Sequence, residues 1–323
     1  MSGCTGIGKP QVAILMAVYE PDLEWLRAQL CSLEKQTYSN LCLYIRDDAS
    51  QKVSFHKIQS CVQDCITAFP FFLRRNEENI GSNRTFQRLT QEAKGDYFAY
   101  CDQDDVWLPE KVETLVEELE SRHAALACSD VTVIDADGRQ IADSITELRP
   151  RHIFRSGEDL AGELIYRNFV IGCTMLLPAG LAREACPFAE SMVHDHYLAL
   201  YAALHGTIYS HPAPLIQYRI HGGNQTGVLS RVTDKATYID RHLGSFVRRV
   251  DELSQRLSFP ELDRAQRWAE ARVANSRGAL GGAYQLWKLR AVNPSTSYFE
   301  LIGLRLPNVL FRKAVRAIQK GKI

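Results

Sequence analysis

An uninterrupted apolar run near the start of the chain, Val12 to Val18, limits the fold more than any other feature of the sequence. A strand that is apolar on both faces must be covered on both, as the strands of parallel α/β sheets are. Helical patterns separate this run from further strand-like segments. The expected strands are 12–18, 41–46, 71–74, 97–101 and 124–134, and the expected helices are 21–36, 53–68, 82–93 and 109–123. The alternation predicts an α/β fold, a doubly wound, mixed but mostly parallel sheet flanked by helices.

Beyond residue 140 the alternation is less regular. We expect a strand at 171–177, a helix at 193–204, and one or two strands over 208–218. From about residue 230 the pattern is helical, with expected helices at 237–257, 260–279 and about 306–320. We therefore predict two domains, residues 1–229 and a C-terminal helical region formed by residues 230–323.

Charge and cysteine content exclude several classes of protein. Lys plus Arg and Asp plus Glu both number 38, so no overall positive field favours nucleic acid, and we predict no nucleic-acid partner. The nine cysteines include no CxxC pair, which favours reduced thiols in a cytoplasmic protein. No apolar stretch is long enough to span a bilayer, and the first residues carry no secretory signal. We expect a cytoplasmic protein that is soluble or rests on a membrane surface.

Three carboxylates stand within four residues directly after the expected strand 97–101, in the loop Asp102-Gln103-Asp104-Asp105. Open α/β sheets bind ligands at this end of their strands. Carboxylates this close repel one another, and their oxygens are the ligands that Mg²⁺ or Mn²⁺ prefer. A bound metal would offset the charge of a departing diphosphate. The structural alternative is a solvated turn in which Asp105 caps the helix that begins near Pro109.

The same loop fits a second chemistry. Residues 102–106 match DxDx[TV], the motif of phosphohydrolases in which Asp102 would be the nucleophile and Asp104 the acid and base. That motif normally follows the first strand of its sheet, whereas three expected strands precede strand 97–101 here. We therefore rank this alternative below metal-assisted diphosphate chemistry.

Other polar residues follow the first two strands. Asp48 could accept a hydrogen bond from a pyrimidine N3–H or a ribose hydroxyl; the alternative for the Asp47-Asp48 pair is an Asx turn or N-cap with Ser50. Tyr19 could stack on a base, and its alternative is an ordinary aromatic side chain at a strand end.

Two further segments could carry catalytic residues. Asp195, between two histidines at the start of an expected helix, could be a general base, although an N-cap is the simpler interpretation. The segment 218–224 combines Arg219, His221 and two glycines, which suits a loop that closes on a diphosphate. Its alternative is a glycine-rich turn.

Five segments, in this order and spacing, resemble the family 2 glycosyltransferases with a GT-A fold. They are residues 12–19, Gln36-Thr37-Tyr38, residues 45–50, Asn79-Ile80-Gly81, and residues 101–111. The resemblance spans roughly residues 10–227. The longer match CDQDDVWLPEK, with Tyr-Arg-x-His-x-x-Asn downstream, is most similar to bacterial rhamnosyltransferases that build O-antigen or cell-wall polysaccharide. It implies a single in-line displacement with inversion at the anomeric carbon.

The resemblance also implies roles for residues. Tyr19 would lie against the nucleobase, Asp48 would bond its N3–H, and Asp104 would be the direct metal ligand. Asp195 would deprotonate the acceptor hydroxyl. The full set expected at the donor is Ala17, Tyr19, Asp48, Arg84, Asp102, Gln103, Arg219 and His221, with Asp104, Asp102 and His221 at the metal.

The chain departs from the family pattern at three places. Glu20 stands where many members have Asn, and Ala49 replaces the usual Gly, so we expect the turn at residues 47–50 to differ in shape. The Gln-x-x-Arg-Trp motif of processive members is missing, because Gln266-Arg267-Trp268 lacks its spacing and is interpreted as part of a helix face. We therefore expect one sugar to be added per encounter.

The resemblance leaves the substrates partly open. We expect a nucleotide-sugar donor, dTDP-rhamnose by resemblance with UDP-hexoses as the alternative, and a saccharide or lipid-linked acceptor. The tail from Arg305 has six Lys or Arg and no acid, so it could form a basic amphipathic helix on the inner face of the plasma membrane. Alternatively, that helix packs on the core. A third hypothesis for the whole chain is a binding module without catalysis.

Overall fold

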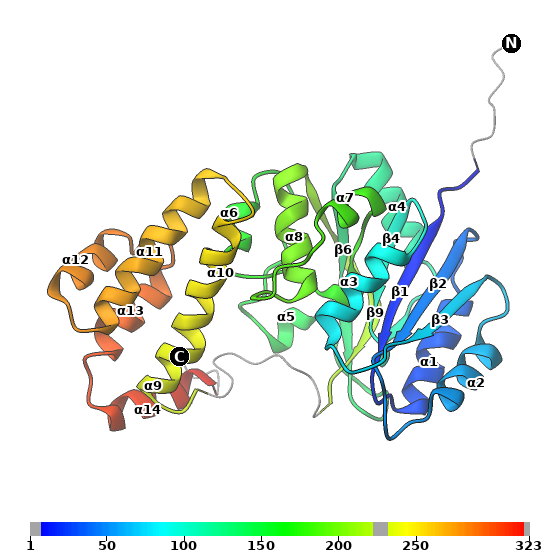
Figure 1. Ribbon diagram of the computed structural model, residues 1–323, viewed down its shortest axis with the longest axis horizontal. Coiled ribbons are helices and arrows are strands. Elements are labelled where there is room, and N and C mark those ends of the chain that lie inside the picture. The colour runs from blue at the N-terminus through cyan, green and yellow to red at the C-terminus, as the bar shows by residue number, and fades with distance from the viewer. Residues whose placement is uncertain (1–7, 222–231, 320–323) are drawn as a thin grey trace, which may run out of the picture. The chain divides into compact units, whose positions relative to one another are not determined.

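The computed structural model describes residues 8–221 and 232–319 (Figure 1). The chain divides into two compact units, Met1–Gly222 and Gly223–Ile323, here named unit 1 and unit 2. The predicted boundary between residues 229 and 230 lies outside the described residues and stays a prediction. Within the described residues, no helix combines the length and the apolar character that crossing a membrane requires.

Unit 1 contains one nine-stranded sheet in the order β3-β2-β1-β4-β8-β6-β9-β5, with β7 paired to β6. The pairs from β3 to β4 are all parallel, and β8 is antiparallel to both of its neighbours. The predicted α/β class, a mixed sheet flanked by helices, is confirmed. The strands are β1 (Val12–Val18), β2 (Leu41–Asp47), β3 (Phe71–Arg75), β4 (Tyr97–Cys101), β5 (Val106–Trp107), β6 (Leu126–Ile134), β7 (Gln140–Ala142), β8 (Leu176–Pro178) and β9 (Ile208–Arg219).

Helices cover both faces of the sheet (Figure 1), which explains the apolar run at β1. Ile14 and Met16 belong to one buried cluster with Leu26 and Leu30 of the first helix, whereas Leu15 between them faces the other side. The helical segments of unit 1 are α1 (Leu23–Glu34), α2 (Phe55–Cys65), α3 (Ser82–Glu92), α4 (Lys111–Arg122), α5 (Ile145–Leu148), α6 (Ala161–Leu164), the 3₁₀ turn η1 (Gly172–Thr174), α7 (Ala179–Glu184) and α8 (His194–His205).

Two expectations for unit 1 need correction. The helix expected from Pro109 begins at Lys111, and β5 precedes it. The strand expected over 171–177 is largely the η1 turn, followed by the short β8. In η1, the Thr174 amide and hydroxyl both donate to the Ile171 carbonyl, at 2.9 and 2.8 Å. Such local bonds replace those of a strand ladder.

Unit 2 is helical, as predicted. Its segments are α9 (Lys235–Tyr238), the π-helical η2 (Ile239–Leu243), α10 (Gly244–Ser254), α11 (Pro260–Ser276), α12 (Leu280–Lys288), α13 (Pro294–Gly303) and α14 (Asn308–Gln319). The sequence did not indicate α12 and α13, because Gly281-Gly282 and Pro294 look like loop residues. At Gly282 the glycine serves packing: a Cβ there would lie 2.5 Å from the Ala274 carbonyl carbon of α11.

The C-terminal helix α14 packs inside unit 2. Phe311 and Val315 are buried in a cluster with Val232 and Tyr238, while the cations Arg312, Lys313 and Arg316 are exposed. These residues therefore match the alternative expectation, in which the terminal helix packs on the core and exposes a basic face to solvent.

Candidate active site

The carboxyl ends of β1, β2 and β4 meet at one edge of the sheet. Val18 lies opposite Asp47, and Met16 lies opposite Cys101. Tyr19, Asp48 and Asp102, which follow these strands, therefore emerge side by side, as expected at the carboxyl ends of parallel strands.

Gln103 links the acidic loop to the end of β1. Its side-chain oxygen accepts the Tyr19 amide hydrogen at 2.8 Å, and its side-chain nitrogen donates to the Tyr19 carbonyl at 3.1 Å. The Tyr19 backbone is thereby held while its ring stays 47% exposed. The predicted contact of Gln103 with the donor stays a prediction.

Asp105 anchors the other end of the loop. Its buried carboxylate accepts the Arg219 amide hydrogen of β9 at 2.9 Å. Helix α4 begins only at Lys111, with Glu110 at its N-cap. The interpretation of Asp105 as the cap of that helix is therefore wrong, because this carboxylate ties the loop to β9.

The Arg219 side chain fastens the loop from β9. Its Nε donates to the Asp104 carbonyl at 2.8 Å, and its Nη1 donates to the carbonyls of Asp135 and Ala136 at 3.0 and 3.2 Å. The guanidinium also lies 5.3 Å from the centre of the Trp25 ring. The predicted contact of Arg219 with a diphosphate is untested, and in this structure the side chain positions the acidic loop.

Trp25 is a site residue that the sequence did not reveal. Its indole nitrogen donates to the Ala136 carbonyl at 3.1 Å, and its ring lies 4.9 Å from that of His221. On α1 it looked like part of an ordinary amphipathic helix, and only the fold brings it beside β9.

His221 and Asp104, both predicted to bind the metal, lie together. The Nε2 atom of His221 is 2.7 Å from an Asp104 carboxylate oxygen, and each side chain is about one-fifth exposed (22% and 19%). The rest of the expected closing loop, residues 222–224, lies outside the described residues.

A buried acidic cluster forms behind the loop surface. One ligand atom from each of Asp102, Asp105 and Cys173 lies within 4.8 Å of the others. Burial raises the pKa of Asp102 well above its usual value, and the charges of Asp105 and Asp104 raise it further. Burial and the charge of Asp104 raise the pKa of Asp105 to about 7, although the Arg219 amide favours the ionised form. The ionised forms of these two carboxyl groups are therefore strongly disfavoured at this site.

Lys111 supplies a buried cation beside this cluster. Its Nζ donates to the Cys173 carbonyl at 2.9 Å and lies 3.0 Å from the centre of the Trp107 ring. Burial lowers the pKa of Lys111 to about 7, against the opposing effects of Cys101, Cys173 and the carboxylates of Asp105 and Asp102. Neither Lys111 nor Cys173 was among the predicted site residues, since a lysine in a helix and a lone cysteine carry no distinguishing spacing.

Asp195 lies in the first turn of α8. It is not the N-cap, a position that Val193 occupies, so the capping interpretation is wrong. One carboxylate oxygen accepts the Gly172 amide hydrogen at 3.1 Å, and the other accepts that of His196 at 2.6 Å. Burial raises the pKa of Asp195 to about 6, and its charge contributes to the raised pKa of Asp102. The expected base therefore interacts with the acidic loop.

Gly172 allows Asp195 to lie this close. A Cβ at position 172 would come within 3.2 Å of both the Asp195 Cβ and the His194 Nε2. The His194 ring stacks on Phe86 with 4.1 Å between centroids, and burial lowers its pKa to about 3. A neutral imidazole thus borders the carboxylate.

The turn with Ser50, the structural alternative for the Asp47-Asp48 pair, is present at Asp47. Asp47 accepts the Ser50 amide and hydroxyl hydrogens at 3.1 and 2.6 Å, which is the Asx-type turn. Asp48 is buried and accepts hydrogen bonds from the Asn76 side chain and from the amides of Ile80 and Gly81, at 2.7, 2.9 and 2.8 Å. Asp48 therefore holds the Asn79-Ile80-Gly81 segment against the strand ends, and its contact with a base stays a prediction.

The two family departures sit in left-handed backbone conformations, with φ of 44° at Glu20 and 60° at Ala49. The turn thus has at Ala49 a conformation that favours glycine, and the expected difference in its shape from other family members stays a prediction. The Glu20 carboxylate accepts the amide hydrogens of Gln51, Lys52 and Val53, which ties the strand end to this turn.

The last two predicted donor residues differ in position. Ala17 is partly buried near the end of β1. Arg84 projects from α3 into solvent and donates to Glu190 at 2.5 Å, with 62% of its side chain exposed. Their contacts with a donor stay predictions.

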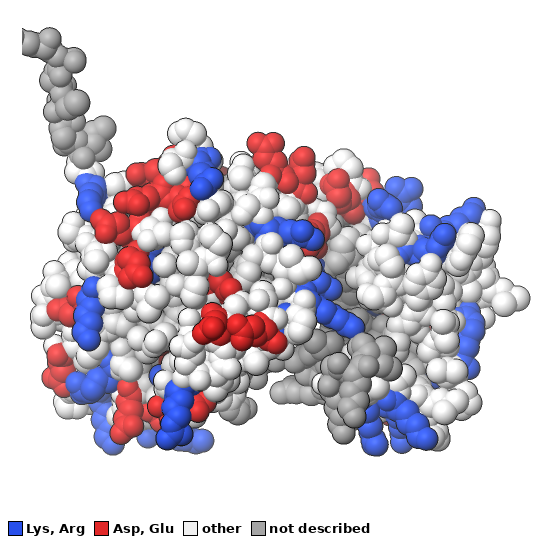
Figure 2. All heavy atoms as spheres, turned by 180° about the vertical axis from the view of Figure 1, so that it is seen from behind, with Lys and Arg blue, Asp and Glu red and all other residues white. Residues whose placement is uncertain are grey.

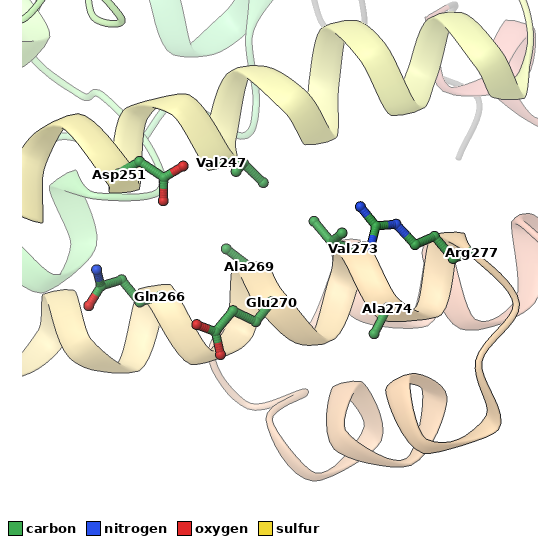
Figure 3. A pocket seen from close by; sticks show the side chains of 8 residues that line it. All are labelled: Val247, Asp251, Gln266, Ala269, Glu270, Val273, Ala274 and Arg277. Carbon is green, nitrogen blue, oxygen red and sulfur yellow. The ribbon is translucent and has the colours of Figure 1, made fainter.

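A groove of about 260 Å³ lies in unit 2, between α10 and α11 (Figure 3). Two carboxylates, those of Asp251 and Glu270, stand toward one end and the Arg277 guanidinium at the other. None of the predicted site residues lines it; the lining residues are Val247, Asp251, Gln266, Ala269, Glu270, Val273, Ala274 and Arg277.

Comparison with known protein families identifies the family to which the chain belongs. The model of glycosyl transferase family 2 matches residues 13–178, which is half of the chain and includes the whole acidic loop. The chain belongs to this family. It is a glycosyltransferase, and the phosphohydrolase alternative for Asp102 has no support.

Two curated relatives illustrate the range of similarity. An uncharacterized glycosyltransferase of Rickettsia typhi is 25% identical over 223 residues, which cover 67% of this chain and 66% of that protein. The dTDP-rhamnosyl transferase RfbG of Shigella flexneri is 24% identical over 238 residues, which cover 69% of this chain and 76% of that protein. The chain thus spans about two thirds of the length of the first of these relatives.

Solved structures share the fold of this family 2 chain. S. aureus TarS in complex with UDP-GlcNAc matches with a TM-score of 0.61 and 13% identity, covering 97% of this chain and 92% of that one. The mannosyltransferase PcManGT from Pyrobaculum calidifontis, in complex with GDP-Man and Mn²⁺, matches with a TM-score of 0.57 and 13% identity, covering 98% and 83%. At this identity the likeness shows the fold alone, which is the predicted GT-A type.

Proposed function

We propose that this chain transfers a single sugar from a nucleoside-diphosphate donor to a saccharide or lipid-linked saccharide acceptor, with inversion at the anomeric carbon. The observation that carries the proposal is the convergence of Asp104, His221 and the partly buried Asp102 with Asp195 at one edge of the sheet. For the donor we propose dTDP-rhamnose, because the Shigella relative is named a dTDP-rhamnosyl transferase. UDP-hexoses are the alternative.

A divalent cation fits the residues at this edge. The buried Asp105 has a carboxylate oxygen without a hydrogen-bond partner among the described residues, and Asp102 is unfavourable in its charged form. Carboxylates and an imidazole are suitable ligands for Mg²⁺ or Mn²⁺. We propose that Asp104, Asp102 and His221 hold the ion. The cation would neutralise charge on the diphosphate leaving group.

The remaining steps belong to side chains of this chain. The exposed Tyr19 ring would lie against the base, and Asp48 would face it from β2. Asp195 would take the proton of the acceptor hydroxyl as that oxygen bonds to the anomeric carbon, while the bond from this carbon to the diphosphate breaks on the opposite face. With a pKa of about 6, Asp195 is ionised at neutral pH and more basic than an ordinary carboxylate.

Replacing the proposed base tests this mechanism. Asp195→Asn should retain donor binding and lose about 10³-fold in transfer rate, within the range for loss of a general base. Donor binding is measured by thermal shift with dTDP-rhamnose, UDP-hexoses and Mn²⁺, since a ligand at a hundred times its Kd stabilises by about 2.7 kcal/mol.

Asp137→Asn is the matched control, because this side chain is 69% exposed in the same unit. Transfer at the unaltered rate in Asp195→Asn would contradict the role of Asp195. Donor binding without turnover on any acceptor in the unaltered chain would instead favour the binding module. A melting shift with UDP-hexoses alone would overturn the choice of dTDP-rhamnose.

A further inference from the structure

The outer helices of unit 2 expose an unusual number of large apolar side chains. Thirteen large hydrophobic residues are exposed among the described residues, and seven of them lie between positions 280 and 310. A concentration of this kind marks an interaction surface. The seven are Leu280, Tyr284 and Trp287 on α12, Tyr298 and Ile302 on α13, and Val309 and Leu310 on α14.

Helix α12 turns one face outward. With 3.6 residues per turn, Leu280, Tyr284 and Trp287 fall within an arc of about 60°, and the buried Gly282 and Leu286 lie on the opposite side. Because Gly282 packs against α11 at a distance that no Cβ could occupy, the orientation of α12 is set. The three exposed side chains therefore form a fixed outer face, with exposed fractions of 85%, 54% and 50%.

The charge of this part of the chain is one-sided. Residues 277–323 contain nine Lys or Arg and a single acid, Glu300, which leaves 29 Lys or Arg and 37 Asp or Glu for residues 1–276. Glu300 is buried and paired with Arg272, so it adds no negative charge to the surface. In Figure 2, unit 2, at the right, is mostly blue and white. Its partner is therefore expected to be anionic.

Cations accompany the exposed aromatic rings of α12. The Lys288 ammonium lies 4.6 Å from the centre of the Tyr284 ring, and the Arg290 guanidinium lies 4.2 Å from that of Trp287. Aromatic rings with cations over their faces suit a membrane–water boundary, where the ring enters the headgroup layer and the cation meets lipid phosphate.

We propose that unit 2 docks on an anionic lipid surface through this outer face of α12. Tyr284 and Trp287 enter the interface, and Lys288 and Arg290 contact lipid phosphates. The contact predicted from sequence lay on the basic tail alone, but α14 buries Phe311 and Val315 inside unit 2 and contributes mainly charge. The proposal does not depend on the identity of the donor or on catalysis.

Vesicle binding of the full chain tests the proposal. Sedimentation with vesicles of phosphatidylcholine alone should be weak, and phosphatidylglycerol should increase it in a salt-sensitive manner. Tyr284→Ala/Trp287→Ala should lower the partition coefficient at least about tenfold. Lys288→Glu/Arg290→Glu should lower it by about fivefold or more for each cation lost.

Matched controls distinguish binding through this face of α12 from non-specific binding to the vesicles. Phe72→Ala removes an aromatic ring that is 52% exposed in unit 1, and Lys52→Glu/Lys57→Glu reverses two exposed cations there. Both should bind vesicles like the unaltered chain. Trp287 is half exposed while Trp107 and Trp268 are buried, so brominated phospholipid should quench its fluorescence, and Trp287→Phe should remove that quenching.

Three results would overturn the proposal. The first is failure of the unaltered chain to sediment with phosphatidylglycerol vesicles at low salt. The second is unchanged binding in Tyr284→Ala/Trp287→Ala. The third is self-association without lipid that the same variant abolishes, since a second copy would then cover the face. Donor binding, followed in the same variants by thermal shift, reports separately on the active site.

Discussion

Each unit buries a cluster of charge, and the two clusters are built in opposite ways. In unit 2, the Arg272 guanidinium lies 2.6 Å from the Glu300 carboxylate, which also accepts the Tyr238 hydroxyl at 2.9 Å, and Trp268 covers the cation. In unit 1, the partly buried Asp102 and the buried Asp105 share a site with one lysine, whose own pKa falls to about 7. Charge is balanced in the first cluster and left unbalanced in the second.

The backbone conformations of the two units differ in a similar way. Unit 1 places two non-glycine residues beside its site, Glu20 and Ala49, in left-handed conformations, and Gly278 is the one residue with positive φ among those described in unit 2. Left-handed conformation costs a non-glycine residue about 1–2 kcal/mol. Unfavourable charge and strain therefore gather at the sheet edge where a charged donor and a cation would bind.

The largest expected loss of stability should come from removing one partner of the Arg272–Glu300 pair. Glu300→Ala leaves the Arg272 guanidinium buried without its carboxylate, which should cost about 3–5 kcal/mol of stability. Denaturant unfolding measures the loss, and hydrogen exchange in α11 and α13 assigns it to unit 2. The double variant Arg272→Met/Glu300→Leu should recover stability to within about 1 kcal/mol of the unaltered chain. A double variant as unstable as Glu300→Ala would show that the pair itself stabilises the unit.

The unbalanced cluster should make stability depend on pH in the opposite way to ordinary salt bridges. Asp105 and Asp195 have pKa values raised to about 7 and 6, so between about pH 4 and 7 these two carboxyl groups hold more protons in the folded state than in the unfolded state. Their contribution to stability in chelator should therefore fall as pH rises through this window, by up to about 1.4 kcal/mol per pH unit for each group. His194 and His242, whose pKa values are lowered to about 3 and 4, contribute in the opposite direction, as does Lys111 between about pH 7 and 10. Thermal unfolding of the unaltered chain and of Asp105→Asn across this range isolates the contribution of Asp105, and a stability difference that does not change between pH 4 and 7 would contradict its raised pKa.

Neutralising one buried acid should then stabilise unit 1 in the absence of metal. Asp105→Asn keeps an oxygen for the Arg219 amide hydrogen and removes a charge. At pH 8 in chelator we expect a gain of about 1–2 kcal/mol, together with a smaller stabilisation by Mn²⁺. Unfolding curves with and without Mn²⁺ provide the measurement, with Asp137→Asn as the exposed control. A loss of stability in chelator would show that the ionised carboxylate is already compensated.

The sequence predicted most of the sheet, because a strand that is buried on both faces appears in the sequence as an uninterrupted apolar run. It also indicated that Asp48 and Asp102 lie near each other, since both directly follow strands of the expected parallel sheet. Asp195 follows no strand, and only the family resemblance pointed to it. It could not find Trp25, Lys111 or Cys173. These residues join the site only through the packing of α1, α4 and η1, and their local patterns resemble ordinary helix or core positions.

The smallest expected change in stability concerns the left-handed backbone conformation in unit 1. Ala49→Gly should relieve left-handed strain at φ 60°, and part of this gain is offset by the greater freedom of glycine in the unfolded chain, which leaves about 0.5–1 kcal/mol. Ala93→Gly is the matched control: Ala93 is 2% exposed, as against 3% for Ala49, but has φ of −68°, so the same change should destabilise. Unfolding midpoints of both variants measure the difference. If both variants lost stability equally, the turn after Asp48 would carry no strain, and unbalanced charge alone would distinguish the active-site edge from unit 2.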